Sequence, residues 1–360
     1  MSLFGGGRLL CLRAGMKSKP RPPGVREVSG AATLKHVADR AGVSPITVSR
    51  ALNKPAMVSA DLRDRVRLAV DELGYVQNRV AGALASASSP VIPVVVPSLS
   101  NAVFIETIQG IQDVVQRAGF QLLLGNTEYD LDREHAWIST FLGWSPPGLI
   151  VAGTRHQPRT RALLERWGRP VVEIMEIGAK PIDMNVGLSH AAAGAAMARH
   201  FLARGYADAL FAGCRLEEDY RAAQRFRGFD RAMAGQGAAR RPPLTRALPS
   251  SPALGGDMLV EALSLARPPR AIFYANDDLA VGAVLRAGRE GIAIPDRIAV
   301  AGFNGLNISA LVTPRLTTIA SPRLDIGRLG AERLLAAIAA RTSEPKRLDV
   351  GFALVAGEST

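Results

Sequence analysis

The stretch ATLKHVADRAGVSPITVSRALN, residues 32–53, predicts two short helices that are joined by a tight turn. Apolar residues at i, i+3, i+4 and i+7 form one face of a first helix: Leu34, Val37, Ala38 and Ala41. Gly42 suits the left-handed position that ends this helix. Ser44 is a good N-cap for a second helix, and Pro45 fits its first position because the N–H that proline lacks has no partner there. These signals agree on two packed helices.

The second helix is predicted to expose side chains that form hydrogen bonds. Val48 and Leu52 would pack against the first helix. The side chains left facing outward are those of Thr47, Ser49, Arg50 and Asn53. Such groups read base edges and bind phosphates. A DNA-reading helix is therefore one interpretation, and an ordinary helical hairpin is the other.

Basic residues are concentrated near the amino terminus. The whole chain has a net charge of +12, and residues 1–90 alone contain fourteen Lys or Arg against six Asp or Glu, which is +8. The remaining chain is close to neutral at +4. This asymmetry predicts a DNA-binding head that is attached to a body with another role.

The composition predicts a soluble chain of two or three compact domains. Its 360 residues are 48% hydrophobic, but no apolar run approaches the roughly 18 residues of a membrane helix. Cys11 and Cys214 have neither metal-ligand spacing nor a disulfide pattern, which favours a reducing compartment. Residues 1–31 are expected to be a disordered basic extension, because Arg13 interrupts the apolar part that a signal peptide needs. Met16 is an alternative start.

A third helix is predicted over residues 60–73, ADLRDRVRLAVDEL, with apolar residues on one face and charges on the other. Gly74 would end this helix. Residues 32–77 therefore form a small helical headpiece. Residues 78–90 are expected to be a short hinge helix and linker before the next domain.

From residue 91 onward, short apolar runs alternate with segments of helical periodicity. This alternation predicts an α/β core of two doubly wound lobes with parallel sheets over residues 91–360. The predicted strands are VIPVVVP (91–97), QLLLGN (121–126), GLIVAG (148–153), PVVEIM (170–175), ALFAGC (209–214), AIFYAND (271–277) and IAVAGF (298–303).

Polar side chains follow several of these predicted strands. Because ligands bind outside the carboxyl ends of parallel strands, we expect a cleft between the lobes there. The ANDD run (275–278) could instead cap the helix that follows it, or one residue could cap while another binds. The polar residues at the strand ends are Ser98, Asn101, Asn126, Thr154 to His156, Asn276, Asp277 and Asn304.

The sequence argues against catalysis. It contains no His-Glu-x-x-His motif, Walker loop, G-x-G-x-x-G after a strand or nucleophile elbow. Its five histidines are scattered, and His156 alone follows a predicted strand end, where it could line the cleft. We therefore predict a binding protein that is not an enzyme and that uses no metal or cofactor.

Residues 33–53 and 58–85 resemble the DNA-binding headpiece of the LacI/GalR bacterial repressors. The A-x-x-A-G-V-S-x-x-T-V-S-R-x-L-N run and the E-L-G-Y-x-x-N entry to the hinge occur at the spacing of that family. The rest of the chain resembles the family's periplasmic-binding-protein-like core, so the likeness covers residues 32–360. The segments most similar to gluconate-utilisation repressors are PSLSNAVFIETIQGI (97–111), ANDDLAVGA (275–283), VAGFNG (300–305) and LDVGFALVAGEST (348–360).

The resemblance implies a helix-turn-helix headpiece followed by two lobes between which the chain crosses near residues 189, 320 and 345. Lobe 1 would contain residues 91–189 and 321–343, and lobe 2 would contain residues 190–319 and 346–360.

The resemblance also implies a mode of DNA binding. Helices 45–53 of a homodimer would enter successive major grooves of a palindromic operator, and Leu84 would wedge into the minor groove. Gly82 costs the hinge helix roughly 0.5–1 kcal/mol relative to alanine, so we expect this helix only on DNA or in a tightly docked dimer. A plain linker is the alternative. The implied contact residues are Thr33, Leu34, Lys35, Ser44, Pro45, Ile46, Thr47, Ser49, Arg50, Asn53, Lys54, Ser59, Tyr75, Asn78, Arg79, Ala81 and Leu84.

The cleft, by the same resemblance, is implied to bind a sugar acid. The family's effector-gripping arginine falls on Arg225, for which a solvated helix arginine is the alternative interpretation. Asn304 stands where many sugar repressors have aspartate, and its neutrality suits an anion. The implied effector residues are Ser98, Asn101, Phe104, His156, Arg225, Asn276, Asp277 and Asn304.

These expectations describe a cytoplasmic, nucleoid-associated repressor of gluconate uptake and catabolism genes that gluconate or a related sugar acid releases from its operator. Two alternatives remain at this point. One is a periplasmic-type solute-binding protein, against which the basic headpiece argues. The other is a regulator of the same family that responds to a different sugar or sugar phosphate. A dimer is favoured over a tetramer because the end of the sequence has no heptad-rich segment.

Overall fold

The computed structural model describes residues 32–76, 89–238, 240–340 and 346–360. Contacts divide the chain into two compact units, Met1–Asn78 and Arg79–Thr360. The predicted basic extension and hinge helix lie outside the described residues. No helix within the described ranges is long and apolar enough to cross a membrane.

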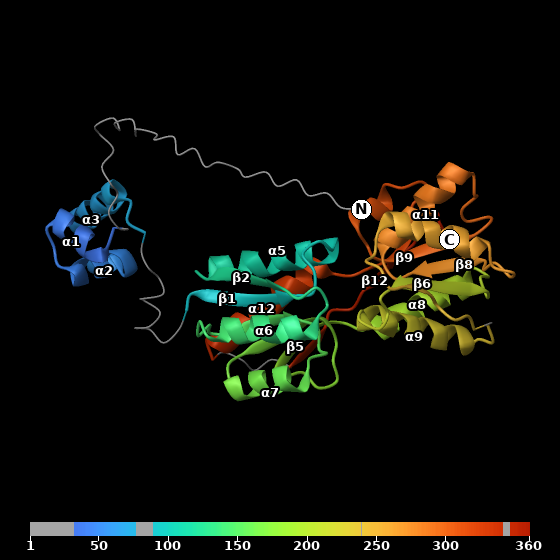
Figure 1. The fold of residues 1–360 in the computed structure, drawn as a ribbon, viewed down its shortest axis with the longest axis horizontal. Coiled ribbons are helices and arrows are strands. Elements are labelled where there is room, and N and C mark those ends of the chain that lie inside the picture. Colours follow the sequence, from blue (N-terminus) through green and yellow to red (C-terminus); the bar gives the residue numbers. More distant parts are fainter. Residues whose placement is uncertain (1–31, 77–88, 239, 341–345) are drawn as a thin grey trace, which may run out of the picture. The chain divides into compact units, whose positions relative to one another are not determined.

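The first unit is a small helical bundle (Figure 1). Its elements are α1 (Leu34–Ala41), α2 (Pro45–Asn53), the 3-10 turn η1 (Pro55–Met57) and α3 (Ala60–Leu73). Its core consists of small and branched aliphatic side chains: Val37, Ala38, Ala41, Val48, Ala51, Val66 and Ala69. The apolar face predicted for the first helix is thus the face that packs into this core.

The helix ends of the first unit follow the predicted capping pattern. Ser44 accepts a hydrogen bond from the Thr47 amide at 3.2 Å and caps α2. Gly42 ends α1 at a φ of 65°, and Gly74 ends α3 at a φ of 58°. Glycine adopts this left-handed conformation at little cost. The helix-turn-helix prediction is therefore confirmed, including the residues that cap the helices.

The first lobe of the second unit has a parallel sheet with the strand order β11-β5-β4-β3-β1-β2. Val94 and Ile150 face α5 and α12, whereas Val95 and Val151 face α6 and α7 on the other side. The elements are β1 (Val91–Val96), α5 (Ala102–Arg117), β2 (Gln121–Asn126), α6 (Leu131–Leu142), β3 (Leu149–Ala152), α7 (Pro158–Trp167), β4 (Val171–Glu176), β5 (Met184–Leu188), α12 (Arg323–Ile338) and β11 (Arg347–Asp349).

The second lobe has the strand order β12-β10-β9-β8-β6-β7, in which the β10–β12 pair is antiparallel. Phe211 and Phe273 face α8 and α9, whereas Leu210 and Ile272 face α10 and α11. The elements are α8 (His190–Ala203), β6 (Ala209–Cys214), α9 (Tyr220–Ala234), β7 (Leu244–Arg246), α10 (Pro252–Leu263), β8 (Ala271–Tyr274), α11 (Asp277–Glu290), β9 (Ala299–Asn304), η2 (Asn307–Ala310), β10 (Thr317–Ala320) and β12 (Ala353–Val355). The predicted pair of doubly wound lobes is confirmed.

The third crossover between the lobes differs from its predicted position near residue 345. The prediction placed residues 346–360 in lobe 2, but β11 pairs with β5 in the first sheet. The chain passes to the second sheet only after Asp349, where β12 pairs with β10. A strand of three residues has too short a pattern to be assigned from sequence.

Helices α8 and α9 pack closely because both carry a glycine at their contact. A Cβ atom on Gly194 would come within 2.0 Å of the Arg225 carbonyl oxygen, and one on Gly228 within 2.0 Å of the Ala191 carbonyl oxygen. No larger residue fits at either position. This close approach brings His190, the first residue of α8, beside Arg225 of α9.

Ser359 joins two strands of the second sheet. Its buried hydroxyl donates to the Val300 carbonyl oxygen at 2.6 Å and accepts from the Thr317 amide at 2.8 Å. We expect Ser359→Ala to lower the free energy of unfolding by about 1–3 kcal/mol, because the Thr317 amide would stay buried without a partner. Urea unfolding measures this loss. Ser139→Ala, on the exposed face of α6, is the control, and an equal loss in both variants would contradict the assignment.

Candidate functional site

A cavity lies at the carboxyl ends of the strands, with lining residues from both lobes. We name it the central cavity. Lobe 1 contributes the start of α5, the turn after β2, and β4, and lobe 2 contributes α8, α9 and the ends of β8, β9 and β10. The lining residues are Asn101, Val103, Phe104, Tyr129, Met175, His190, Asp219, Arg221, Arg225, Asn276, Phe303, Asn304 and Ser321.

Arg225 carries a buried positive charge into the central cavity. Its Nη1 donates to His190 Nδ1 and its Nη2 to the Ala275 carbonyl oxygen, both at 2.9 Å. The guanidinium lies 4.1 Å from the centroid of the Phe303 ring. Its Nε has no hydrogen-bond partner, and no carboxylate among the described residues forms an ion pair with it. Burial lowers its pKa to about 10, so Arg225 remains a cation at neutral pH. An anionic ligand would complement this charge.

His190 is neutral and has one free ring nitrogen. Burial, together with Arg225 and Arg221, holds the pKa of His190 well below its usual range. Because an arginine can only donate, His190 Nδ1 must accept, and the ring proton is therefore on Nε2. Nε2 is buried and has no hydrogen-bond partner of full geometry among the described residues, although the Met175 backbone lies close enough to the ring to act on the pKa of His190. It is available as a donor to an oxygen of a ligand.

Arg221 is a second buried guanidinium, one helical turn before Arg225. It lies over the rings of Tyr220 and Phe104, at 5.3 and 5.9 Å from their centroids. Burial disfavours its charge, but Tyr220, Glu176 and Asp219 outweigh that effect and raise the pKa of Arg221. Its Nη1 is buried and has no hydrogen-bond partner among the residues that the structure describes. The central cavity therefore has two cationic donors on one face of α9.

Two asparagines of the central cavity also cap helices. Asn101 accepts from the Val103 amide at 3.1 Å and starts α5. Asn276 accepts from the Leu279 amide at 3.0 Å and starts α11. The capping interpretation of the ANDD run is thus correct for Asn276, whose side chain also lines the cavity. Capping holds these amides in place.

Asn304 and Arg323 connect the cavity to the first lobe. Asn304 has a φ of 121°, a conformation that residues other than glycine rarely adopt. Its carbonyl oxygen accepts from Arg323 Nη1 of α12. Arg323 Nη2 donates to Glu106 of α5 at 3.0 Å. The strained end of β9 is therefore held by helices of the other lobe.

A second bridge between the lobes centres on one oxygen of Glu176. Tyr220, at the start of α9, donates from its hydroxyl to Glu176 Oε1 at the end of β4. The amide and the hydroxyl of Thr154 both donate to the same oxygen at 2.6 Å. Glu176 Oε2 is buried without a partner. Tyr220 thus joins α9 to the carboxyl ends of two lobe 1 strands.

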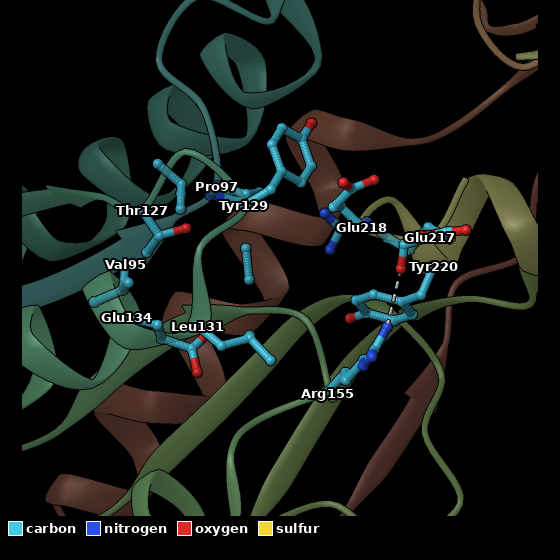
Figure 2. A pocket seen from close by; sticks show the side chains of 13 residues that line it. Val95, Pro97, Thr127, Tyr129, Leu131, Glu134, Arg155, Glu217, Glu218 and Tyr220 are labelled. Atoms are coloured by element: carbon cyan, nitrogen blue, oxygen red, sulfur yellow. Dashed lines mark hydrogen bonds between the residues drawn. The ribbon is translucent and has the colours of Figure 1, made fainter. Parts of the chain in front are cut away.

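Two further pockets adjoin the central cavity. The rim pocket shares Asn101, Tyr129, Asp219 and Asn276 with it and also contains Ser98. The outer pocket shares Tyr129 and Arg221 with it. Figure 2 shows the outer pocket, with Thr127, Leu131 and Glu134 on one side and Glu217, Glu218 and Tyr220 on the other.

Asp277, predicted to contact an effector, does not line any of these three hollows. It is fully buried and accepts from Thr318 Oγ1 at 2.6 Å and from the Leu306 amide at 2.7 Å. Burial raises the pKa of Asp277 to about 6. Its carboxylate faces β10 and the turn after β9, so its observed role is to fix the backbone beside Asn304.

His156, the other predicted contact that the structure contradicts, points into lobe 1. Its side chain is 1% exposed and lies between two carboxylates, with Nδ1 at 2.7 Å from Glu134 and Nε2 at 3.2 Å from Glu173. Burial alone would lower its pKa, but the two carboxylates raise the pKa of His156 to about 9. His156 is therefore part of a buried charge cluster and does not line the central cavity.

The other predicted effector residues lie in or beside the central cavity. Asn101, Phe104, Arg225, Asn276 and Asn304 line it. Ser98 is in the rim pocket, where its hydroxyl accepts from the Asn101 amide at 3.1 Å.

The predicted DNA-reading helix exposes Arg50 and Asn53, whereas Thr47 and Ser49 are half-buried. Ile46 is 72% exposed at the start of α2, although it is apolar. Ser44 and Thr47 share a hydrogen bond between their hydroxyls at 2.8 Å, and Asn53 donates to the Ser49 carbonyl oxygen at 3.0 Å. The lysine and arginine side chains predicted to contact phosphate in this unit are exposed: Lys35, Arg50 and Lys54.

Other predicted DNA contacts in this unit have packing or capping roles as well. Leu34 is half-buried and packs on the helical core, as does Tyr75. Thr33 caps α1 and Ser59 caps α3. The predicted contacts in the hinge lie outside the described residues: Asn78, Arg79, Ala81 and Leu84.

Comparison with known proteins matches both units of the chain. Residues 33–78 match the lacI family of bacterial regulatory proteins, and residues 198–360 match a periplasmic binding protein-like domain. The chain is 44% identical to the HTH-type transcriptional regulator GntR of Pseudomonas aeruginosa, over 92% of this chain and 96% of that protein. It is 38% identical to GntR of Escherichia coli K12, over 91% of this chain and 98% of that protein. The crystal structure of a LacI-family transcriptional regulator from Silicibacter pomeroyi has a TM-score of 0.86 and 37% identity, and the match covers 91% of this chain and 99% of that one.

The protein therefore belongs to the LacI family of bacterial regulatory proteins. The family resemblance in the sequence is confirmed, and so is the prediction of a DNA-binding transcriptional regulator in place of an enzyme. Regulators of this family bind operator DNA and small-molecule effectors and act as dimers.

Several cavity residues were missed by the sequence analysis. Arg221 could have been found, because it lies four residues before Arg225 and hence on the same face of a predicted helix. His190 is the first residue of α8, directly after the first crossover between the lobes. Tyr129 lies in the turn between β2 and α6. No local pattern in the sequence connects these two residues with Arg225.

The charge cluster around His156 predicts a pH-dependent stability. The pKa of His156 is about 9 in the folded chain and about 6.5 when unfolded. Protonated His156 thus contributes stability that is fully present below pH ~6.5 and is lost as the pH rises through about 9. We expect the free energy of unfolding to fall over this interval and His156→Gln to reduce that fall. Urea unfolding from pH 6 to 10 tests this, with His135→Gln as the control. An unchanged pH profile in His156→Gln would rule out the cluster as its source.

Ile46 offers a test of the DNA-reading helix. Its side chain forms no hydrogen bonds, so we expect it to contact thymine methyl groups. Ile46→Ala should redistribute the preference among operator sequences and leave non-specific binding nearly unchanged. Binding to a randomised operator library measures this. Val48→Ala, buried on the same helix, should weaken binding to all sequences through folding. Equal weakening by Ile46→Ala would assign Ile46 to folding alone.

Proposed function

We propose that this regulator represses genes for the uptake and catabolism of gluconate or a closely related sugar acid, and that binding of the sugar acid in the central cavity releases it from its operator. The single observation that carries the proposed ligand is Arg225, a buried cation that forms no ion pair with a carboxylate of the described residues, although Asp219 lines the same cavity. The likeness to regulators named GntR supports the same class of regulator.

The proposed ligand has a carboxylate at one end and hydroxyls along its length. The carboxylate would pair with Arg225 and accept from His190 Nε2, both of which have a free buried donor. Charge-assisted hydrogen bonds of this kind are about twice as strong as neutral ones. The amides of Asn276 and Asn304 can both donate to and accept from hydroxyls, which suits a polyol chain. A neutral hexose would leave Arg225 without an anion.

A sugar acid that also carries phosphate is the second candidate effector. The observation that favours it is the unpartnered Nη1 of Arg221, which could bind a second anionic group. The two candidates share the carboxylate and differ in total charge, so a titration of gluconate and its phosphorylated form against the same protein separates them.

The proposed DNA complex has two headpieces of a homodimer on a palindromic operator, with hinge residues 78–90 in the central minor groove. We place this complex in the cytoplasm, on the nucleoid. Effector binding would change the relation between the lobes, because residues of both lobes line the central cavity. A ligand that binds two conformations with different affinity shifts the equilibrium between them, and no other mechanism is required.

Arg225→Ala tests the proposed ligand. Loss of a charge-assisted pair costs on the order of 1.5–3 kcal/mol, so we expect sugar-acid affinity to fall about ten- to a hundredfold. Calorimetry with gluconate, 6-phosphogluconate and glucose measures it. Operator binding should persist, but release should require correspondingly more effector.

Arg227→Ala is the matched control, because Arg227 lies on the same helix and its side chain is exposed. It should leave the affinity unchanged. Tight binding of glucose together with no binding of any sugar acid would overturn the proposed ligand. Unchanged sugar-acid affinity in Arg225→Ala would overturn the proposed role of Arg225.

A further inference from the structure

Tyr129 occupies the junction of three hollows in the core. Among the described residues that line them, it is the one shared by the central cavity, the rim pocket and the outer pocket. The rim pocket shares three other residues with the central cavity, so these two hollows meet along a broad boundary. The outer pocket shares only Arg221 besides Tyr129. The boundary between the central cavity and the outer pocket therefore depends on these two side chains.

The backbone of the turn that carries Tyr129 is fixed at both ends. The Thr127 amide donates to the Val96 carbonyl oxygen at 3.0 Å, and the Asp130 amide donates to the Thr127 carbonyl oxygen at 3.0 Å. Glu128 and Tyr129 have φ values of 53° and 65°, which bulky residues rarely adopt. Asn101 lies beside the tyrosine side chain and lines the same two hollows, the central cavity and the rim pocket. The turn thus holds the ring at the junction, beside a cavity residue.

The outer pocket has a chemistry that differs from that of the central cavity. Three glutamates, Glu134, Glu217 and Glu218, line it together with Arg155 and Arg221 (Figure 2). Glu217 is also tied to the first lobe, because its carbonyl oxygen accepts from Arg155 Nη1 at 3.3 Å. Carboxylates accept hydrogen bonds from the hydroxyls of a sugar, and guanidinium groups donate to them. This lining suits a neutral glycosyl unit.

We infer that Tyr129 determines the size of the effector. By closing the central cavity toward the outer pocket, it limits the ligand to a single sugar-acid residue. Without the ring, the two hollows join, and a sugar acid that carries one neutral hexose binds with its acid unit in the central cavity and its hexose in the outer pocket. This inference rests on the proposed function, since it assigns the acid unit to Arg225.

The test compares Tyr129→Gly with Tyr129→Phe. Glycine removes the ring and accepts the positive φ, whereas phenylalanine keeps the ring and removes only the hydroxyl. The probes are gluconate, the aldobionic acids lactobionate and melibionate, which carry the hexose on different hydroxyls, and the neutral disaccharide lactose. Calorimetry gives the affinities, and melting temperature with operator retention shows that each variant is folded. Tyr129→Ala replaces Tyr129→Gly if the glycine variant does not fold.

The wild type and Tyr129→Phe are expected to bind gluconate and to reject both aldobionates. Tyr129→Gly should bind at least one aldobionate about tenfold or more tighter than the wild type, and gluconate within about tenfold of the wild-type affinity. Lactose should bind to none of them. In the double variant Tyr129→Gly/Leu131→Trp, the indole refills the outer pocket, so the gained affinity should be lost while gluconate binding remains.

The outcomes distinguish a failure of the proposed function from a failure of the proposed role of Tyr129. If no sugar acid binds the wild type, the proposed function fails, and this inference fails with it. If gluconate binds the wild type but Tyr129→Gly gains no aldobionate, the proposed function stands and the role of Tyr129 is wrong. Equal binding of an aldobionate to the wild type, or a gain that survives the Leu131→Trp change, would overturn it as well.

Discussion

The arrangement of the central cavity depends on a buried guanidinium that, within the part of the chain the structure describes, forms no ion pair with a carboxylate. Removing such a charge from water is costly unless other groups compensate it. The protein offers Arg225 a backbone carbonyl, the face of Phe303 and the ring nitrogen of His190. His190 can accept only while it is neutral, and burial together with the two arginines keeps it so. The charge of Arg225 thereby determines the tautomer of His190 and the sign of the charge that a ligand must bring.

The parts of the fold that the sequence predicted are those with local signals. The headpiece follows from caps and apolar spacing within about twenty residues, and the long central strands follow from continuous apolar runs. Strands β5, β10 and β11 gave no such signal. Strand β10 contains Thr317 and Thr318, whose side chains bond to Thr360 and Asp277 far away in the sequence. Polar residues whose hydrogen-bond partners are distant in the sequence are typical of a loop, so the local pattern does not predict this strand.

The candidate site was predicted to the extent that position along a strand determines it. The rule that ligands bind beyond strand ends located Asn101, Asn276 and Asn304 correctly in the cavity, but it does not give side-chain direction. Two neighbouring residues show the difference, since Asn276 lines the cavity and Asp277 faces away from it toward β10. His156 follows a strand in the same way, yet two buried glutamates draw its ring into lobe 1. The direction of a side chain depends on its partners in other helices and strands, and the sequence does not show which residues become partners.

The third crossover has a mechanical consequence. It connects the edge strands β11 and β12, and it begins where the Val350 amide donates to the Gly187 carbonyl oxygen at 2.9 Å, two residues before the first crossover at Ser189. Two connections that are hydrogen-bonded side by side resist sliding past each other, but they can bend together about one line. We therefore expect relative rotation of the lobes to be easier about that line than about other axes. A ligand that binds between the lobes would then drive mainly one rotation of the lobes relative to each other.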